Sequence, residues 1–413
     1  MNASRSALPD HGASWPALEA RLHGFSDKDV KWREGKTAIY IFNAGEEVER
    51  VKKAAYAMFS EENGLGPAAF PSLMEMERQV VGFGLALLNA PTDAAGSMTS
   101  GGTDSITMAV KAARDHARAA DRKRKRFNMV LPFSAHPAFD KAAMLMDIEV
   151  RRTPLKAYLA DPAAIEAAID DSTLMIVGSA PSFPFGVIDP IEALSDIAER
   201  RGVWLHVDAC VGGYIAPFVR MNGADLPVFD FAAPGVSSIS ADLHKYGYCA
   251  KGSSTVFFRS AALKEHMTFD AGPWPLGRMQ TPTLHGTRPG GAIAAAWAVM
   301  NFLGVQGYRE KHALVTQARE KVEEGVAKLG FRVLGRPLLG NIAFTHDSAD
   351  IFALLRALHK RGWVTAALIE PPALHMMLSP IHAQAADAYL ADLADAMRAR
   401  DDGGAPAASG YGA

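Results

Sequence analysis

The stretch that decides the fold is residues 240–254, which read SADLHKYGYCAKGSS. Strands are predicted on either side of it, at 237–240 and 255–258, so Lys245 follows closely after a strand. In sheets of parallel strands, ligands bind at the carboxyl ends of the strands. A lysine there can form a Schiff base with a carbonyl group, although most single lysines in loops are solvated surface charges.

Helical and strand-like patterns alternate along the chain before this stretch. A segment with helical spacing is followed each time by a short segment that we read as a strand. The helices are expected at 104–122, 136–146, 162–169 and 191–200, and the strands at 127–131, 148–153, 174–178 and 203–207. Strands that alternate with helices indicate βαβ units. The sequence therefore predicts an α/β fold with a large, mostly parallel sheet.

The pattern changes after Met300. A charged helix at 310–329 leads into strands at 331–334, 342–345 and 376–378 and helices at 351–360 and 385–399, which predict a second, smaller α/β unit. Just before it, residues 289–308 carry no charged side chain over a length of about 20 residues, enough to span a bilayer. Because this stretch contains proline, glycine and asparagine, we expect a buried alanine-rich helix and no integral membrane segment.

Composition and charge exclude other classes. The 413 residues are 49% hydrophobic and 21% charged, as in ordinary globular proteins. With 43 Lys and Arg against 45 Asp and Glu, the net charge is −2, so we expect no nucleic-acid partner and read the basic run at 122–126 as a solvated helix end. Cys210 and Cys249 offer no disulfide framework and no metal-ligand spacing. Without a signal peptide at the start, these features predict a cytoplasmic protein with no metal.

Three further polar features follow predicted strands. Asp208 either caps a helix or keeps a pyridine nitrogen protonated. The run TSGGTDS at 99–105 opens a helix, where backbone N–H groups bind an anion or an ordinary cap suffices. His136 either stacks on a flat ring or is structural. An anion cradle, a stacking histidine, an aspartate and then Lys245 form the order required by pyridoxal phosphate (PLP) enzymes of the aspartate aminotransferase fold.

The chain resembles the sphingosine-1-phosphate lyases, within the group II decarboxylase-like PLP enzymes. The segments that carry the resemblance are residues 240–254, HVDACVGGY at 206–214, TSGGTDS at 99–105, FPSLMEMERQVV at 70–81, APSFPFGVIDPI at 180–191 and HGTRPGG at 285–291. It is dense over 36–289 and looser beyond. It implies the fold type I PLP-dependent transferase fold, and an aldehyde-lyase that cleaves a phosphorylated sphingoid base to a long-chain aldehyde and phosphoethanolamine.

The resemblance also implies how the cofactor is held. Lys245 would carry PLP, Asp208 would pair with its pyridine nitrogen, and His136 would stack on its ring. The remaining cofactor-binding residues would be Gly102 and Thr103 at the phosphate, together with Cys210, Ser240 and His244.

A homodimer with shared active sites follows from the same resemblance. Gly286 and Thr287 would reach the cofactor phosphate of the other subunit, and Tyr40 would enter the partner's site. Asn63, Tyr40 and Lys251 would contact the phosphorylated amine substrate, with Lys251 either at the substrate phosphate or in proton transfer. We expect residues 1–60 to serve the dimer and the active site, 61–305 to form the PLP domain, 306–400 to form the small domain, and 401–413 to be a disordered tail.

Two departures from the family pattern keep alternatives open. The loop at 63–66 reads Asn-Gly-Leu-Gly, so Gly66 replaces a histidine of the family's substrate pocket. Residues 36–39 lack the small Ser-Gly pair that precedes the family tyrosine. The alternatives are a lyase for another β-hydroxy amine, a group II amino-acid decarboxylase, and a PLP-binding protein without activity.

Overall fold

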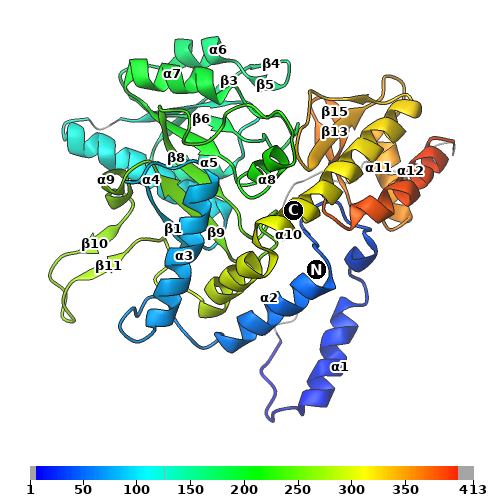
Figure 1. Ribbon diagram of the computed structural model, residues 1–413, viewed down its shortest axis with the longest axis horizontal. Coiled ribbons are helices and arrows are strands. Elements are labelled where there is room, and N and C mark those ends of the chain that lie inside the picture. The colour runs from blue at the N-terminus through cyan, green and yellow to red at the C-terminus, as the bar shows by residue number, and fades with distance from the viewer. Residues whose placement is uncertain (1–5, 125, 399–413) are drawn as a thin grey trace.

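The protein is described here from a computed structural model over residues 6–124 and 126–398 (Figure 1). A seven-stranded sheet lies at its centre, in the order β1-β9-β8-β7-β6-β2-β3. These strands are β1 (Ala95–Thr99), β2 (Asn128–Pro132), β3 (Glu149–Thr153), β6 (Thr173–Ser179), β7 (Trp204–Asp208), β8 (Val236–Ala241) and β9 (Ser254–Phe258). Strands β8, β7, β6, β2 and β3 pair in parallel, and β9 runs antiparallel to both β8 and β1.

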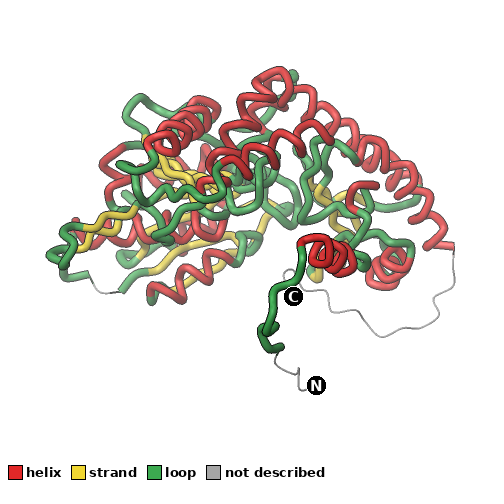
Figure 2. Tube along the Cα trace, turned by 90° about the horizontal axis from the view of Figure 1, so that it is seen from below, coloured by secondary structure: helices red, strands yellow, loops and turns green. Residues whose placement is uncertain are grey.

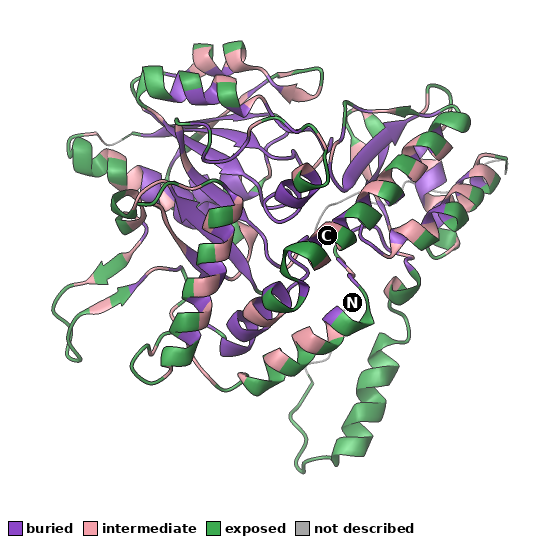
Figure 3. Cartoon of the chain, in the orientation of Figure 1, coloured by how far each residue is buried: buried purple, intermediate pink, exposed green. Residues whose placement is uncertain are grey.

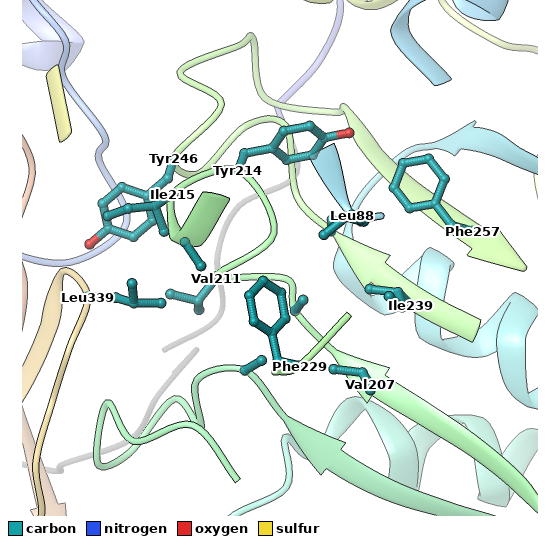
Figure 4. Packing of buried hydrophobic residues seen from close by; sticks show 14 of the residues in the cluster. Leu88, Val207, Val211, Tyr214, Ile215, Phe229, Ile239, Tyr246, Phe257 and Leu339 are labelled. Atoms are coloured by element: carbon teal, nitrogen blue, oxygen red, sulfur yellow. The ribbon is translucent and has the colours of Figure 1, made fainter. Parts of the chain in front are cut away.

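Strands β2, β6, β7 and β9 are buried along their whole length, as expected where helices cover both faces of a sheet, whereas the edge strand β3 is partly exposed. Alternate residues of one strand enter different core clusters: Val130 joins one, and Met129 and Leu131 join the other. The covering helices are α3 (Pro71–Leu87), α4 (Gly102–Ala120), α5 (Ala138–Met146), α6 (Pro162–Ala168), α7 (Ile191–Arg201), α8 (Ala216–Met221) and α9 (Ala261–Glu265). Figure 4 shows one cluster, in which Val207, Ile239 and Phe257 lie on the sheet.

A second, antiparallel sheet forms the carboxyl-terminal part of the fold. Its strands lie in the order β12 (Arg332–Val333), β13 (Asn341–Thr345), β15 (Pro372–Met377) and β14 (Ala366–Ile369). Helices α11 (Ile351–Lys360) and α12 (His382–Arg398) share a core with this sheet. Figure 1 shows this part in yellow to red beside the large sheet.

One long helix, α10 (Gly290–Lys328), joins the two parts. Its first half is alanine-rich and mostly buried, as predicted. At Gly304 the backbone leaves the helical region (φ 54°, ψ −175°), so the element consists of two helices across a kink. Within the described part of the chain, no helix has the length and apolar character needed to cross a bilayer.

The amino-terminal elements lie against the rest of the fold to very different degrees. Helix α1 (Trp15–Ser26) buries none of its residues and projects away from the body (Figures 1 and 3). After a short 3-10 turn, η1 (Trp32–Glu34), the backbone of Ala38 pairs with Val364 beside β14. Helix α2 (Glu46–Met58) then packs along α10. Figure 2 shows the first described residues, from residue 6 onward, below the body.

The predicted fold class and the mostly parallel sheet are confirmed. Strand β1 was not predicted, because its sequence AGSMT lacks a run of large apolar residues. The sequence also gave no sign of β14 or of two hairpins, β4 (Leu155–Lys156) with β5 (Leu159–Ala160) and β10 (Phe269–Ala271) with β11 (Met279–Thr281). The tail predicted at 401–413 lies outside the described residues.

Candidate active site

A cavity of about 350 Å³ opens where the parallel strands end. Loops after β2, β6 and β8 contribute His136, Phe183 and Lys245, and the last residue of β7 contributes Asp208. The start of α4 closes the opposite wall. This position is expected, because the carboxyl ends of parallel strands meet at one edge of a sheet. The cavity brings together seven predicted cofactor residues: Gly102, Thr103, His136, Asp208, Cys210, His244 and Lys245.

Lys245 forms an ion pair with a buried carboxylate. Its Nζ lies 3.0 Å from Asp242 Oδ2, while Ser254 Oγ donates a hydrogen bond of 2.5 Å to Asp242 Oδ1. His244 Nε2 lies 3.6 Å from the same carboxylate. Burial opposes ionisation of Asp242, but the charges of Lys245 and His244 outweigh it and hold the pKa of this carboxyl below its usual value. The lysine amine is thereby held inside the cavity.

Asp208 is fixed at the end of β7 by one of its two oxygens. Its Oδ1 accepts hydrogen bonds from Cys210 N at 3.1 Å and from Ser240 Oγ at 3.3 Å. Ser240 Oγ in turn lies 3.1 Å from Nε2 of the buried His206. Among the described residues, Oδ2 of Asp208 has no hydrogen-bond partner. Asp208 therefore fits a ring N–H, and Ser240 lies behind it rather than on the cavity wall.

The start of α4 is suited to bind an anion. No side chain caps its first N–H groups at Gly101, and a helix amino terminus attracts negative charge. A Cβ on Gly102 would lie 2.9 Å from both Asp242 Oδ2 and Cys210 Sγ, so only glycine leaves this wall open. Asp104 Oδ2 accepts hydrogen bonds from Ser100 N and Oγ and fixes the preceding turn. These residues fit a phosphate group.

His136 lies over the cavity at the start of α5. Its Nδ1 accepts a hydrogen bond of 3.1 Å from Ala138 N, and its ring meets Phe183 edge to face with centroids 6.4 Å apart. Burial lowers the pKa of this imidazole below its ordinary value. The ring is therefore uncharged at neutral pH, which suits stacking on a flat cofactor.

Tyr40 and Lys251 lie outside this cavity but contact each other. Lys251 Nζ donates hydrogen bonds to the carbonyl oxygens of Tyr40 at 2.7 Å and His244 at 3.4 Å. Burial among protein atoms and then repulsion from Lys245 lower the pKa of Lys251 to about 8, although the Lys251 residue is also exposed to solvent. Within one chain, Tyr40 approaches its own active site.

Asn63, Gly286 and Thr287 form a separate group. Asn63 Oδ1 accepts a hydrogen bond of 3.0 Å from Arg288 N, and its Nδ2 lies 3.5 Å from Thr287 Oγ1. Arg288 forms a buried ion pair with Glu77 at 2.5 Å. In one chain, Asn63, Gly286 and Thr287 do not line the cavity around Lys245. Their roles toward substrate or a partner's cofactor stay predictions.

Sequence reasoning missed Asp242, Ser254 and Phe183. Asp242 stands three residues before Lys245, and a loop lysine beside an acidic residue is too common a pattern to single it out. Ser254 reaches the site only because β9 pairs with β8. In the part of the chain that the structure describes, no group of three or more His, Cys, Asp or Glu residues could hold a metal ion.

A second, larger cavity adjoins the first and is mostly apolar. Its volume is about 700 Å³, and it shares His136 and Phe183 with the cavity around Lys245. Its apolar wall includes Phe133, Phe185, Leu355, Val364, Ala366, Ala367, Leu368 and Ile369, with Tyr40 at one side, and polar lining residues include Arg152, His359, Glu370 and His375. Most of these residues belong to the carboxyl-terminal unit, so this cavity lies between the two sheets.

The arrangement defines a PLP-dependent enzyme of fold type I. A family model described as the pyridoxal-dependent decarboxylase conserved domain matches residues 30–347, so the chain belongs to that family and uses PLP. A solved glutamate decarboxylase from Lactobacillus brevis shares the fold, with a TM-score of 0.84 at 20% identity over 98% of this chain and 97% of that chain.

Within this class, the chain belongs to the sphingosine-1-phosphate lyase family. The lyase from Oryza sativa subsp. japonica is 38% identical over 403 residues, which cover 95% of this chain and 74% of that protein. The solved sphingosine-1-phosphate lyase from Burkholderia pseudomallei K96243 superposes with a TM-score of 0.92 at 36% identity, over 96% of this chain and 93% of that chain. The family predicted from the sequence motifs is confirmed.

Proposed function

We propose that the protein cleaves a phosphorylated sphingoid base into a long-chain aldehyde and phosphoethanolamine. The observation that carries the proposal is the mostly apolar cavity of about 700 Å³ joined to the cofactor site through His136 and Phe183. An amino acid needs no such space, whereas an alkyl chain does. Each buried CH₂ contributes about 0.8 kcal/mol, so a long chain binds favourably there.

Lys245, Gly102, Thr103 and Asp208 hold the cofactor in this proposal. When bound, PLP accepts the electron pair left by the broken carbon–carbon bond. The uncapped N–H groups at the start of α4 would bind its phosphate. Asp208, oriented by Cys210 N and Ser240 Oγ, keeps the proton on the ring nitrogen. The neutral ring of His136 would stack on the cofactor.

The reaction balances without an oxidant or a second substrate. The bond between the amine-bearing carbon and the carbinol carbon breaks, the hydroxyl proton passes to a base, and the carbinol carbon leaves as an aldehyde. The amine-bearing carbon gains a proton and becomes phosphoethanolamine. Asp242 would hold the Lys245 amine close by, ready to take back the cofactor when the product leaves.

A homodimer is the assembly we propose. Helix α1 supports it, because this helix exposes large apolar side chains and buries none of its residues. Those side chains are Trp15, Leu18, Leu22 and Phe25. A contiguous apolar helix face of this kind is typical of a contact surface. We also propose a division into domains near Gly304, where α10 is interrupted, and a cytoplasmic location, supported by two cysteines that remain free thiols.

The test is a product assay on the PLP-loaded protein. A phosphorylated sphingoid base is added, and the aldehyde and phosphoethanolamine are quantified by mass spectrometry. We expect the two products in equal amounts. Release of carbon dioxide from an amino acid, with no aldehyde from the sphingoid base, would contradict the proposal.

A further inference from the structure

A third cavity, of about 310 Å³, lies between α2 and the Lys251 loop. Lys52, Lys53 and Lys251 line it, with Glu49 as its acidic residue. His244 lines both this basic cavity and the cavity around Lys245, so the two are adjacent. Among these lysines, only Lys251 has a role in the candidate active site.

The charges around the basic cavity do not balance. Glu49 Oε1 is already bound by Arg33 at 2.9 Å and by Lys53 at 2.5 Å. Lys52 is half-buried, and within the described ranges it forms no ion pair or hydrogen bond. Lys251 is bonded to carbonyl oxygens and has no carboxylate partner there either. Two positive charges therefore face the cavity without an acidic partner.

The electrostatics of both amines agree with this imbalance. Burial lowers the pKa of Lys52, and burial followed by repulsion from Lys245 lowers the pKa of Lys251. A buried charge without a partner is costly, and a nearby anion offsets that cost. Because a phosphate monoester carries nearly two negative charges at pH 7, it matches the two amines that lack a carboxylate partner.

The hydrogen-bond donors and the wall of the basic cavity also suit a phosphate group. Asn43 lines the cavity and uses its Oδ1 to accept a hydrogen bond from Gly45 N, which leaves its amide N–H groups as donors. The segment from Tyr40 to Phe42 divides this cavity from the apolar one, since Ile41 and Phe42 line the former and Tyr40 lines the latter. The active site is thus flanked by one basic and one apolar cavity.

We propose that Lys52 is a specificity-determining residue for the phosphate of the substrate, which would bind in the basic cavity beside Lys251. This inference rests on the proposed function: in a phosphorylated sphingoid base, the phosphate is attached one carbon from the amine-bearing carbon. The amine lies at Lys245, the phosphate lies on the His244 side with Lys52 and Lys251, and the alkyl chain lies on the His136 side.

The first test measures anion binding, independent of turnover. Inorganic phosphate and phosphoethanolamine are titrated calorimetrically into the PLP-loaded protein. Lys52→Gln is expected to weaken both by about tenfold, from the loss of one close charge pair, and Lys52→Arg is expected to restore binding. Arg50→Gln is the matched control, because Arg50 is exposed on the same helix and lines none of the cavities. Equal binding by Lys52→Gln and Arg50→Gln overturns the site.

The second test measures kinetics. Lys52→Gln should raise KM for the phosphorylated base about tenfold with kcat within about twofold, and should leave an unphosphorylated β-hydroxy amine unaffected. Aldehyde release with a wild-type KM in Lys52→Gln overturns this inference and leaves the proposed function standing. If no substrate gives aldehyde, the proposed function fails. Loss of phosphate binding in Lys52→Gln would still support an anion site in the basic cavity, and that site would then bind free phosphate.

Discussion

The cavity around Lys245 and the apolar cavity beside it are built in different ways. The first is lined by loops at the ends of adjacent strands, and its polar groups are fixed by hydrogen bonds such as those of Asp208 and Asp242. The second is assembled from segments far apart in the sequence, including Tyr40, Phe133 and Ala366. Chemistry therefore resides in short motifs, whereas the space for the substrate depends on how the two sheets lie together.

Removal of Lys245 should have the largest effect and acts only on the first cavity. Lys245→Ala is expected to lose the visible absorbance of the bound cofactor and at least about a thousandfold in kcat, since the amine that carries PLP is gone. Absorbance spectroscopy measures the loss of the bound cofactor, and the aldehyde assay measures the fall in kcat. A retained absorbance band would show that another residue carries the cofactor.

Asp208→Asn should be the next largest change. An amide cannot keep the ring nitrogen protonated, so we expect kcat to fall by about a hundredfold or more with little change in KM. The hydrogen bonds from Cys210 N and Ser240 Oγ can still reach the amide oxygen, so the fold should be preserved. Steady-state kinetics measure kcat and KM, and circular dichroism checks that the fold is preserved. A variant with wild-type kcat would remove Asp208 from the mechanism.

A substitution in the apolar cavity should change substrate preference instead of chemistry. Ala366 lines this cavity and belongs to none of the core clusters, so Ala366→Phe fills the space at little cost in stability. KM for a long-chain substrate should rise about tenfold, the equivalent of losing roughly two buried CH₂ groups. A short-chain phosphorylated β-hydroxy amine is the internal control and should keep its KM. Equal losses for both chain lengths would refute the role of the cavity.

The smallest effect concerns pH and the basic cavity. Because the pKa of Lys251 is lowered to about 8, its charge is lost as the pH rises from 7 to 9. The substrate phosphate is already ionised above pH 7, so KM should rise several-fold over this range. Lys251→Arg stays charged and should flatten the profile. A KM that does not change between pH 7 and 9 in the wild type would separate Lys251 from phosphate binding.

The contrast between the cavities also explains what could be predicted from the sequence. Lys245, Asp208, His136 and Gly102 each lie at the end of a strand or the start of a helix, where local pattern fixes their position. The alternation of helices and strands predicted the sheet for the same reason. These features depend on short-range sequence and are read directly from it.

Features that depend on long-range contacts could not be predicted. Asp242 became important only through its distance to Lys245, and Ser254 through the pairing of β9 with β8. The unbalanced charge of Lys52 required the positions of Arg33 and Lys53 around Glu49. Strand β1 was missed because small residues carry little hydrophobic signal, although its place at the sheet edge positions the start of α4.

The most direct test of the account is a competition between the two reaction types. The PLP-loaded protein is given a phosphorylated sphingoid base together with glutamate and tyrosine, and aldehyde, phosphoethanolamine and carbon dioxide are measured in one reaction. We expect equal amounts of aldehyde and phosphoethanolamine and no carbon dioxide. Carbon dioxide from an amino acid in the absence of aldehyde would contradict it.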